Sequence, residues 1–320
     1  MALEQHKQKA LIKAFVKKIP GINYFRNLKT RGSNESKYCY SVWLRHLVLL
    51  SKYSHNAPKV IAELGPGDSI GVCLAALLSG TEKIYAFDVN NTINIEENLK
   101  IFDELIELFK NLTPIPGNDI YPRLNPHLDS YDFPKNLITR EILKYTMDNE
   151  RIQIIRSEIM KLKEATNFNG TFICYQAPWN TTEAFFTSSI DLVLSQAVLE
   201  HVLNLDETYE IMKKWLCNGG YLSHQIDFKC HGTSTKWNGH WLYGPVEWQY
   251  VNDVEGPAIN RKTYKYHLNM LEQKGFNILL TNLVKRSDGF PYNYLLEKFP
   301  STDISKEEFE TSGMFVIAKK

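Results

Sequence analysis

The fold is decided by the stretch Val60-Ile61-Ala62-Glu63-Leu64-Gly65-Pro66-Gly67-Asp68-Ser69, which is followed by a second stretch, Ile84-Tyr85-Ala86-Phe87-Asp88. Each stretch contains an apolar run that predicts a buried strand, and the glycines of the first predict a tight turn into a helix. Glycine lets a ligand approach the backbone, and a carboxylate at the tip of the next strand can accept hydrogen bonds from both ribose hydroxyls. The two stretches therefore predict a nucleoside-binding site.

Strands and helices are predicted to alternate along the rest of the chain. Helical spacing of apolar residues predicts helices over 70–79, 205–216 and 260–274, with Asn204 as the N-cap of the second. Apolar runs predict strands at 171–176, 190–195, 221–227, 276–284 and 314–318, with a turn at 217–220. Such alternation is typical of an α/β protein with a doubly wound, mostly parallel sheet, in which ligands bind at the carboxyl ends of the strands.

The glycine spacing distinguishes between nucleoside cofactors. A dinucleotide fingerprint has glycine at its first, third and sixth positions, whereas the sixth position here is Ile70 and the next glycine, Gly71, comes one residue late. With Glu63 two residues before Gly65, the turn resembles the first motif of class I S-adenosylmethionine-dependent methyltransferases, although Ser69 stands where a third glycine is usual. The segments 40–47, 75–80 and 198–202 look like a bacterial branch of that superfamily that is associated with cell-surface polysaccharide clusters.

This resemblance covers residues 59–320 and implies a seven-stranded, Rossmann-like methyltransferase fold whose last strand is antiparallel. It implies a methyltransferase domain at 57–320, preceded by a helical extension at 1–56, with an inserted segment at 91–165 and an acceptor loop at 228–258. The insertion is expected to be either a lid or pocket wall, or a surface ornament. S-adenosylmethionine is the cofactor implied, and the residues expected to bind it are Glu63, Gly65, Pro66, Gly67, Ser69, Asp88, Val89, Gln176, Ala177 and Gln196. Gln176 or a backbone carbonyl would take the place of the acid that often binds the adenine amino group.

The acceptor loop is dense in aromatic residues. Trp237, His240 and Trp241 are its candidates for binding a flat acceptor such as a sugar ring. A loop of this length is uncommon in a compact domain unless it is functional. The alternative is that these rings form a small core beneath the loop.

Methyl transfer from a sulfonium needs an acceptor held in line with the methyl group, and a hydroxyl acceptor also needs a base. The candidates for this catalytic role are His201, which follows the strand at 190–195, and His224, Asp227 and His231 around the end of the strand at 221–227. Each histidine has a purely structural alternative. The last three have a spacing that suits a divalent metal only if the strand ends near Ile226, because alternate residues point to opposite faces. We therefore assign no metal ligands from the sequence.

Composition limits the possible partners and compartment. The 320 residues include 37 Lys and Arg against 36 Asp and Glu, a net charge of +1 that argues against a nucleic-acid-binding protein. Five scattered cysteines suit a reducing compartment, and no apolar run is long enough to span a membrane, so we expect a cytoplasmic protein. The basic, amphipathic first 31 residues suit either peripheral contact with an anionic membrane or a helix packed by its apolar side. Composition does not predict the oligomeric state.

The function expected is O-methylation of a small molecule, saccharide or glycolipid by an S-adenosylmethionine-dependent methyltransferase. One alternative is a nucleotide-binding scaffold without turnover, which the presence of Glu63 and Asp88 disfavours. A nicotinamide-dependent sugar oxidoreductase is a weaker alternative. The late third glycine and the lack of a Tyr-x-x-x-Lys pair in a suitable helix oppose it.

Overall fold

The computed structural model describes Leu11 and residues 33–320, apart from 55, 163–166, 180–187 and 253–257. Its strands are β1 (Val60–Leu64), β2 (Lys83–Phe87), β3 (Asn167–Asn169), β4 (Ile173–Gln176), β5 (Ile190–Gln196), β6 (Leu216–Asp227), β7 (Asn277–Lys285) and β8 (Thr311–Lys319). Its helices are α2 (Ser36–Leu50), α3 (Gly71–Leu78), α4 (Ile95–Lys110), α5 (Arg140–Thr146), α6 (Asn149–Lys161), α7 (Leu205–Trp215), α8 (Pro245–Val251), α9 (Tyr264–Gln273), α10 (Tyr292–Lys298) and α11 (Lys306–Glu310), with short 3₁₀ turns η1 (Leu199–His201) and η2 (Gly239–Leu242).

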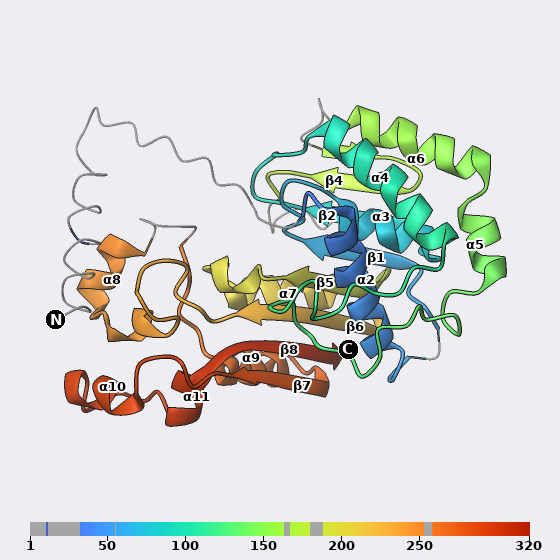
Figure 1. Cartoon of the computed structure of the whole chain (residues 1–320). Coiled ribbons are helices and arrows are strands. Elements are labelled where there is room, and N and C mark those ends of the chain that lie inside the picture. Colours follow the sequence, from blue (N-terminus) through green and yellow to red (C-terminus); the bar gives the residue numbers. More distant parts are fainter. Residues whose placement is uncertain (1–10, 12–32, 55, 163–166, 180–187, 253–257) are drawn as a thin grey trace.

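The strands form one eight-stranded sheet in the order β3-β4-β2-β1-β5-β6-β8-β7 (Figure 1). Strands β4, β2, β1, β5 and β6 are parallel to one another, and β8 lies antiparallel between β6 and β7. The predicted doubly wound, mostly parallel sheet is confirmed, and its last strand is antiparallel as the resemblance implied. The eighth strand is β3, a three-residue antiparallel partner of β4 at the sheet edge, which the sequence did not predict.

Two local predictions, a helix cap and a turn, can be compared with the structure. The side chain of Asn204 caps α7 by accepting from the backbone N–H of Glu207, as its position before the helical pattern predicted. The turn predicted at 217–220 lies instead inside β6. Pairing with β5 jumps from Leu216 to Tyr221, so these residues bulge from the strand, and Gly219 adopts a φ of 80°.

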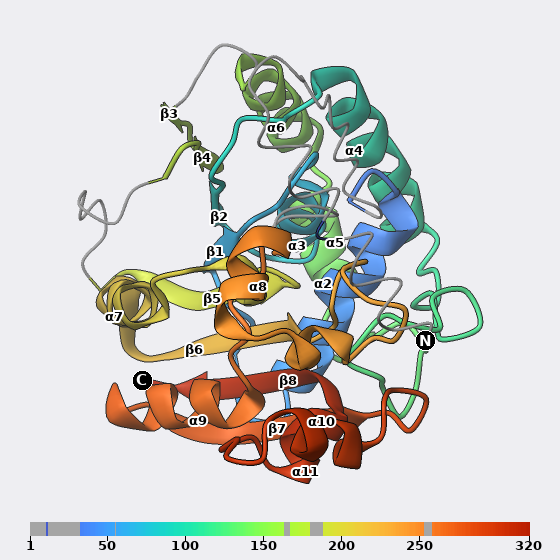
Figure 2. The same cartoon turned by 90° about the vertical axis from the view of Figure 1, so that its left-hand side faces the viewer.

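Helices cover both faces of the sheet, with α2 to α6 over one face and α7 and α9 over the other (Figure 2). Because successive strand residues point to opposite faces, Ile61 packs on the first side and Ala62 on the second. The inserted segment 91–165 supplies buried side chains of α4 and α6 to the first layer, namely Phe102, Leu105, Phe109, Ile155 and Ile159. The insertion is thus part of the core and not a surface ornament.

The proline-rich part of the insertion is fixed to α2 by Arg45. This fully buried guanidinium donates hydrogen bonds to the carbonyl oxygens of Pro116, Leu124 and Pro126 at 3.2, 2.7 and 2.8 Å. Several charge-assisted bonds from one planar donor hold an irregular segment in a single position. As a result, residues 116–126 form a fixed wall beside the sheet edge at which the parallel strands end.

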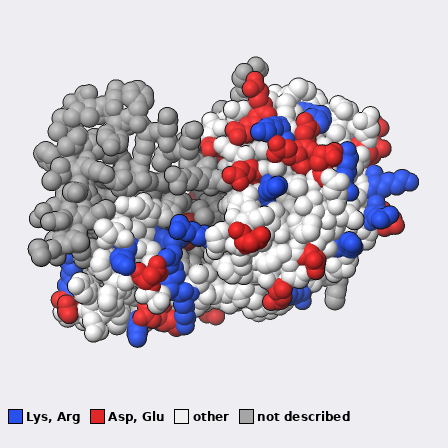
Figure 3. Space-filling model, viewed as in Figure 1, with Lys and Arg blue, Asp and Glu red and all other residues white. Residues whose placement is uncertain are grey.

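The surface agrees with the nearly balanced composition. On the face in Figure 3, basic and acidic side chains are interspersed over the described residues. No helix among the described residues combines the length and apolarity that a membrane crossing requires. The basic start lies outside the described residues except for Leu11, which packs against a cluster of Tyr243, Trp248, Val251 and Ile259.

Candidate functional site

The turn after β1 depends on two glycines. Gly65 and Gly67 have φ values of 65° and 75°, in the left-handed region that favours glycine. A Cβ on Gly65 would also lie 2.7 Å from a methyl group of Val198, which follows β5. The N–H of Gly65 donates to the carbonyl oxygen of Phe87 at 2.8 Å. The glycine turn is therefore tied to the neighbouring strands on both sides.

Asp88 holds the exit of β2 against this turn. Its Oδ2 accepts from the N–H of Gly67 at 3.0 Å, and its Oδ1 accepts from the N–H groups of Val89 and Asn90 at 2.7 and 3.2 Å. Burial raises the pKa of this carboxyl, while the three backbone donors oppose that effect. Each carboxylate oxygen has further lone pairs, so Oδ2 can still accept from a ligand hydroxyl.

The next loop continues the same edge. The N–H of Asp88 donates to the carbonyl oxygen of Gln176 at 3.0 Å, and the N–H of Trp179 donates to that of Asp88 at 2.9 Å. Ala177 is buried between them, whereas Val89 exposes 65% of its surface. The exposed apolar side chain of Val89 can pack on the flat face of a nucleoside base, and the neighbouring carboxylate of Asp88 can bind the ribose. The strand predicted at 171–176 is confirmed, since it corresponds to β4, which pairs with β2.

Three other predicted cofactor residues, in the turn or next to it, are buried. The carboxylate of Glu63 is 3% exposed and accepts from the Cys73 thiol at 3.0 Å, and burial raises its pKa to about 7. The hydroxyl of Ser69 donates to the carbonyl oxygen of Ser33 and accepts from the N–H of Gly71 at 3.2 Å. Pro66 is buried as well. These side chains support the turn from inside the core.

A cavity of about 580 Å³ opens beside the ends of β5 and β6. Its walls combine apolar side chains with polar and charged ones, among them Arg123, Asn125, Gln196, Gln225, Asp227 and Lys229. The amide of Gln196 donates to the carbonyl oxygen of Asn125 at 3.1 Å and lies 3.2 Å from Nε2 of His46. The insertion and the sheet thus share one cavity, and residues 120–125 and 127 of the insertion form part of its wall.

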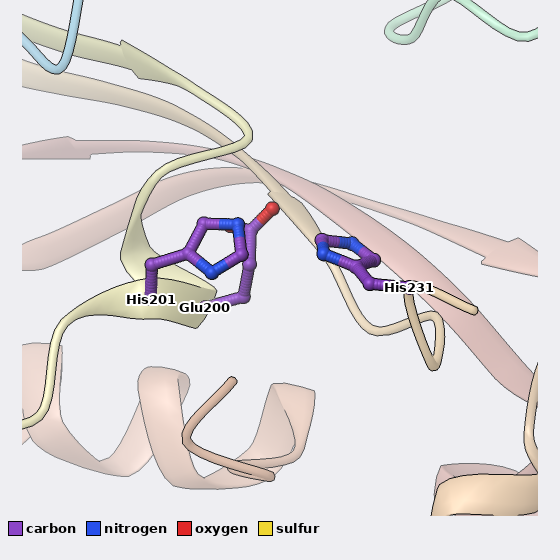
Figure 4. A group of neighbouring side chains, drawn as sticks. All are labelled: Glu200, His201 and His231. Carbon is purple, nitrogen blue, oxygen red and sulfur yellow. The ribbon is translucent and has the colours of Figure 1, made fainter. Parts of the chain in front are cut away.

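His201 and His231 come together near this cavity, as two of the predicted catalytic residues. Their ring centroids are 5.0 Å apart, and Nε2 of His231 lies 3.6 Å from Oδ2 of Asp227. Nδ1 of His201 lies 2.8 Å from the carbonyl oxygen of Ala258, and burial lowers the pKa of His201. Glu200 completes the group, since its carboxylate is directed between the two rings (Figure 4).

His224 does not belong to this group, and its prediction as a catalytic residue is wrong. Strand β6 continues through Asp227, so His224 lies within the sheet, fully buried, with Nδ1 2.8 Å from the hydroxyl of Ser195. Burial lowers its pKa to about 3, which keeps the ring neutral. Because the strand continues through Asp227, the side chains of His224 and Asp227 point to opposite faces, and the metal site considered for His224, Asp227 and His231 is not formed.

The acceptor loop is folded inward. Trp237, His240 and Trp241 expose only 8, 1 and 5% of their surface. Trp241 packs with Leu295 and Phe309, which come from α10 and α11. The prediction that these aromatic side chains offer an open surface to an acceptor is therefore wrong, and Trp241 belongs to the small core that was the alternative.

Glu200 is the residue that the sequence argument missed. It stands directly after β5 in the pair Glu200-His201, so the signal was an acid next to a candidate histidine at a strand end. Its significance depends on His231, which the loop after β6 brings near. Arg123 and Asn125 were also missed, because nothing local shows that the proline-rich stretch reaches the sheet edge.

The sequence matches no protein-family model and no curated protein. Solved structures of similar shape include an S-adenosylmethionine-dependent methyltransferase from Mesorhizobium loti, 13% identical, covering 85% of this chain and 96% of that one with a TM-score of 0.42. Another from Methanosarcina mazei is 14% identical, with the same coverage and a TM-score of 0.43. A putative one from Listeria monocytogenes is 13% identical, covering 87% of this chain and 98% of that one with a TM-score of 0.41. Such distant likenesses carry no conclusion about the reaction.

Proposed function

We propose that the protein binds S-adenosylmethionine at the ends of β1, β2 and β4 and methylates a hydroxyl of a small-molecule or saccharide acceptor. The observation that carries this proposal is the hydrogen bond between Gly67 and Asp88, which sets a ribose-binding carboxylate against an open glycine turn. Asp88 would accept from the ribose hydroxyls, and Val89 would pack on the adenine. Gln176 and Ala177 would flank the adenine edge, while Glu63, Pro66 and Ser69 would support the turn.

The acceptor would lie in the cavity of about 580 Å³, with Gln196 between cofactor and acceptor. The polar and charged side chains in its mixed wall suit the hydroxyl groups, and the apolar ones the ring faces, of a saccharide or of the sugar of a glycolipid. When bound, the sulfonium supplies an activated methyl group. Asp227 lines the cavity and lies next to His231, so we assign removal of the acceptor proton to the group formed by His201, His231 and Asp227.

The nicotinamide alternative receives no support from Gly71. A Cβ at this position would clash with Sγ of Cys39, so Gly71 is required where α3 packs against α2. A cytoplasmic location is supported by the cysteines, all five of which are free thiols. Contact with a membrane through the basic start remains part of the proposal for a lipid-linked acceptor.

The test is transfer of a labelled methyl group from S-adenosylmethionine to a panel of saccharides and glycolipids. We expect labelled product and S-adenosylhomocysteine in equal amounts, both lost with Asp88→Ala. Binding of the cofactor without transfer to any acceptor would favour the scaffold alternative. Asp132→Ala, at an exposed position of the insertion, is the matched control.

A further inference from the structure

Glu200, His201 and His231 bring a carboxylate and two imidazoles to one place. Ligand atoms of the three side chains lie within 4.8 Å of one another. Glu200 and His201 belong to η1, directly after β5, and His231 follows β6 (Figure 4). We propose that these three residues form a binding site for a divalent transition-metal ion.

The carboxylate of Glu200 is buried without a hydrogen-bond partner in the part of the chain that the structure describes. Its side chain is 3% exposed, and neither carboxylate oxygen has a hydrogen-bond partner among the described residues. A buried carboxylate without partners is costly whether it is charged or protonated, because even a protonated carboxyl needs an acceptor. A cation held by the two oxygens removes that cost.

His201 is oriented so that its Nε2 is available to a metal ion. Its Nδ1 lies 2.8 Å from the carbonyl oxygen of Ala258, which can only accept, so Nδ1 carries the proton and Nε2 keeps its lone pair. A ligating histidine typically donates its other N–H to a carbonyl or carboxylate in this way. The turn itself is fixed by Asn260, whose amide donates to the carbonyl oxygens of Leu199 and Val202 at 2.7 and 2.8 Å.

His231 has a left-handed backbone conformation. Its φ of 46° is uncommon for a residue with a side chain, and the conformation directs the ring toward His201. Asp227, with Oδ2 3.6 Å from Nε2 of His231, supplies a second carboxylate at the rim. The loop thus accepts an unfavourable conformation at the residue that completes the cluster.

The donor set indicates the type of ion. Two imidazoles and one carboxylate suit Zn²⁺, Mn²⁺, Co²⁺ or Fe²⁺, whereas Mg²⁺ prefers oxygen ligands alone. Three protein ligands leave coordination positions open for an acceptor hydroxyl, whose pKa a bound cation lowers. With the ion bound, the lone pairs of His201 and His231 would be used as ligands, so Asp227 would be the base of the proposed group that accepts the proton of the acceptor hydroxyl and passes it to water. The oxygen would then bond to the methyl carbon as the carbon–sulfur bond breaks and S-adenosylhomocysteine leaves. This role rests on the proposed function, but metal binding itself does not.

The test uses the full-length protein after removal of metal with a chelator. Titration with Co²⁺, followed by its visible absorption, and calorimetry with Zn²⁺ are expected to give one site per chain. His201→Ala and His231→Gly are expected to weaken binding by at least about 100-fold. Glycine accepts the φ of residue 231, so His231→Gly keeps the backbone unstrained. His127→Ala removes an exposed imidazole outside the cluster and is expected to leave the metal affinity unchanged.

Wild-type protein that binds neither Co²⁺ nor Zn²⁺ below millimolar concentration would overturn the metal site. So would a His231→Gly variant with the wild-type affinity and Co²⁺ spectrum. S-adenosylmethionine is titrated into the same metal-free protein, so that failure of the metal site and failure of the proposed function are seen separately. Each ligand can bind or fail to bind without the other.

Discussion

The backbone N–H of Gly67 donates to Oδ2 of Asp88 at 3.0 Å, so the turn after β1 and the carboxylate after β2 form one unit. Gly65 joins the same unit through its hydrogen bond to Phe87. These contacts link neighbouring parallel strands at their carboxyl ends, where open α/β sheets bind ligands. The proposed cofactor site therefore depends on a few backbone positions that substitutions can probe.

Replacing Gly65 with alanine is expected to lower the free energy of unfolding by about 1–3 kcal/mol. The added methyl group is disfavoured at a φ of 65° and would approach Val198 to 2.7 Å. Urea denaturation measures the change. The double variant Gly65→Ala with Val198→Ala should recover the part due to the clash, and equal stability of Gly65→Ala and wild type would refute both explanations.

Glu63→Gln is expected to stabilise the protein at alkaline pH. The pKa of Glu63 is about 7 in the folded protein and about 4.5 when unfolded, so the folded state binds the proton more tightly. The stabilisation that protonated Glu63 gives the folded state is fully present below pH 4.5 and is lost as the pH rises through 7. The free energy of unfolding of the variant should exceed that of wild type by on the order of 3 kcal/mol at pH 8. At pH 5 the titration of Glu63 should make little difference between the two proteins. Chemical denaturation at the two pH values tests this, and a difference independent of pH would exclude it.

His224 is expected to make the protein sensitive to acid. Burial lowers the pKa of His224 to about 3, below its value of about 6.5 in the unfolded chain. The unfolded chain therefore binds the proton more tightly, and stability falls as the pH drops below 6.5. His224→Asn should be less stable than wild type at pH 7.5 because of its smaller side chain, but the gap should narrow toward pH 5. Parallel stability curves for the two proteins would show that the ring does not titrate on unfolding.

The sequence predicted those features that depend on neighbours along the chain. Gly65, Gly67 and Asp88 were recognised because a glycine turn and a strand-end carboxylate have local signatures, and Asn204 was recognised as a helix cap for the same reason. Burial of Trp241 was only one of two alternatives, because its partners, Leu295 and Phe309, are supplied by distant helices.

The catalytic candidates show the same division. The end of β6 at Asp227 was predicted correctly, but His224 lies three residues before that end, inside the sheet, where its ring is buried beside Ser195 of the neighbouring strand. Glu200 was missed because its significance lies in its distance to His231, which only the fold determines. Sequence patterns therefore predicted the local geometry of the turn at Gly65 and Gly67 better than the cluster of Glu200, His201 and His231.

The most direct test of the proposed cofactor is calorimetric titration of the purified protein with S-adenosylmethionine and, separately, with NAD. We predict binding of S-adenosylmethionine at micromolar concentration and no binding of NAD. Asp88→Ala should weaken binding of S-adenosylmethionine by at least about tenfold, because a charged acceptor of the ribose hydroxyls is lost. Asp132→Ala should leave it unchanged. Binding of NAD alone, or of neither molecule, would contradict the proposed function.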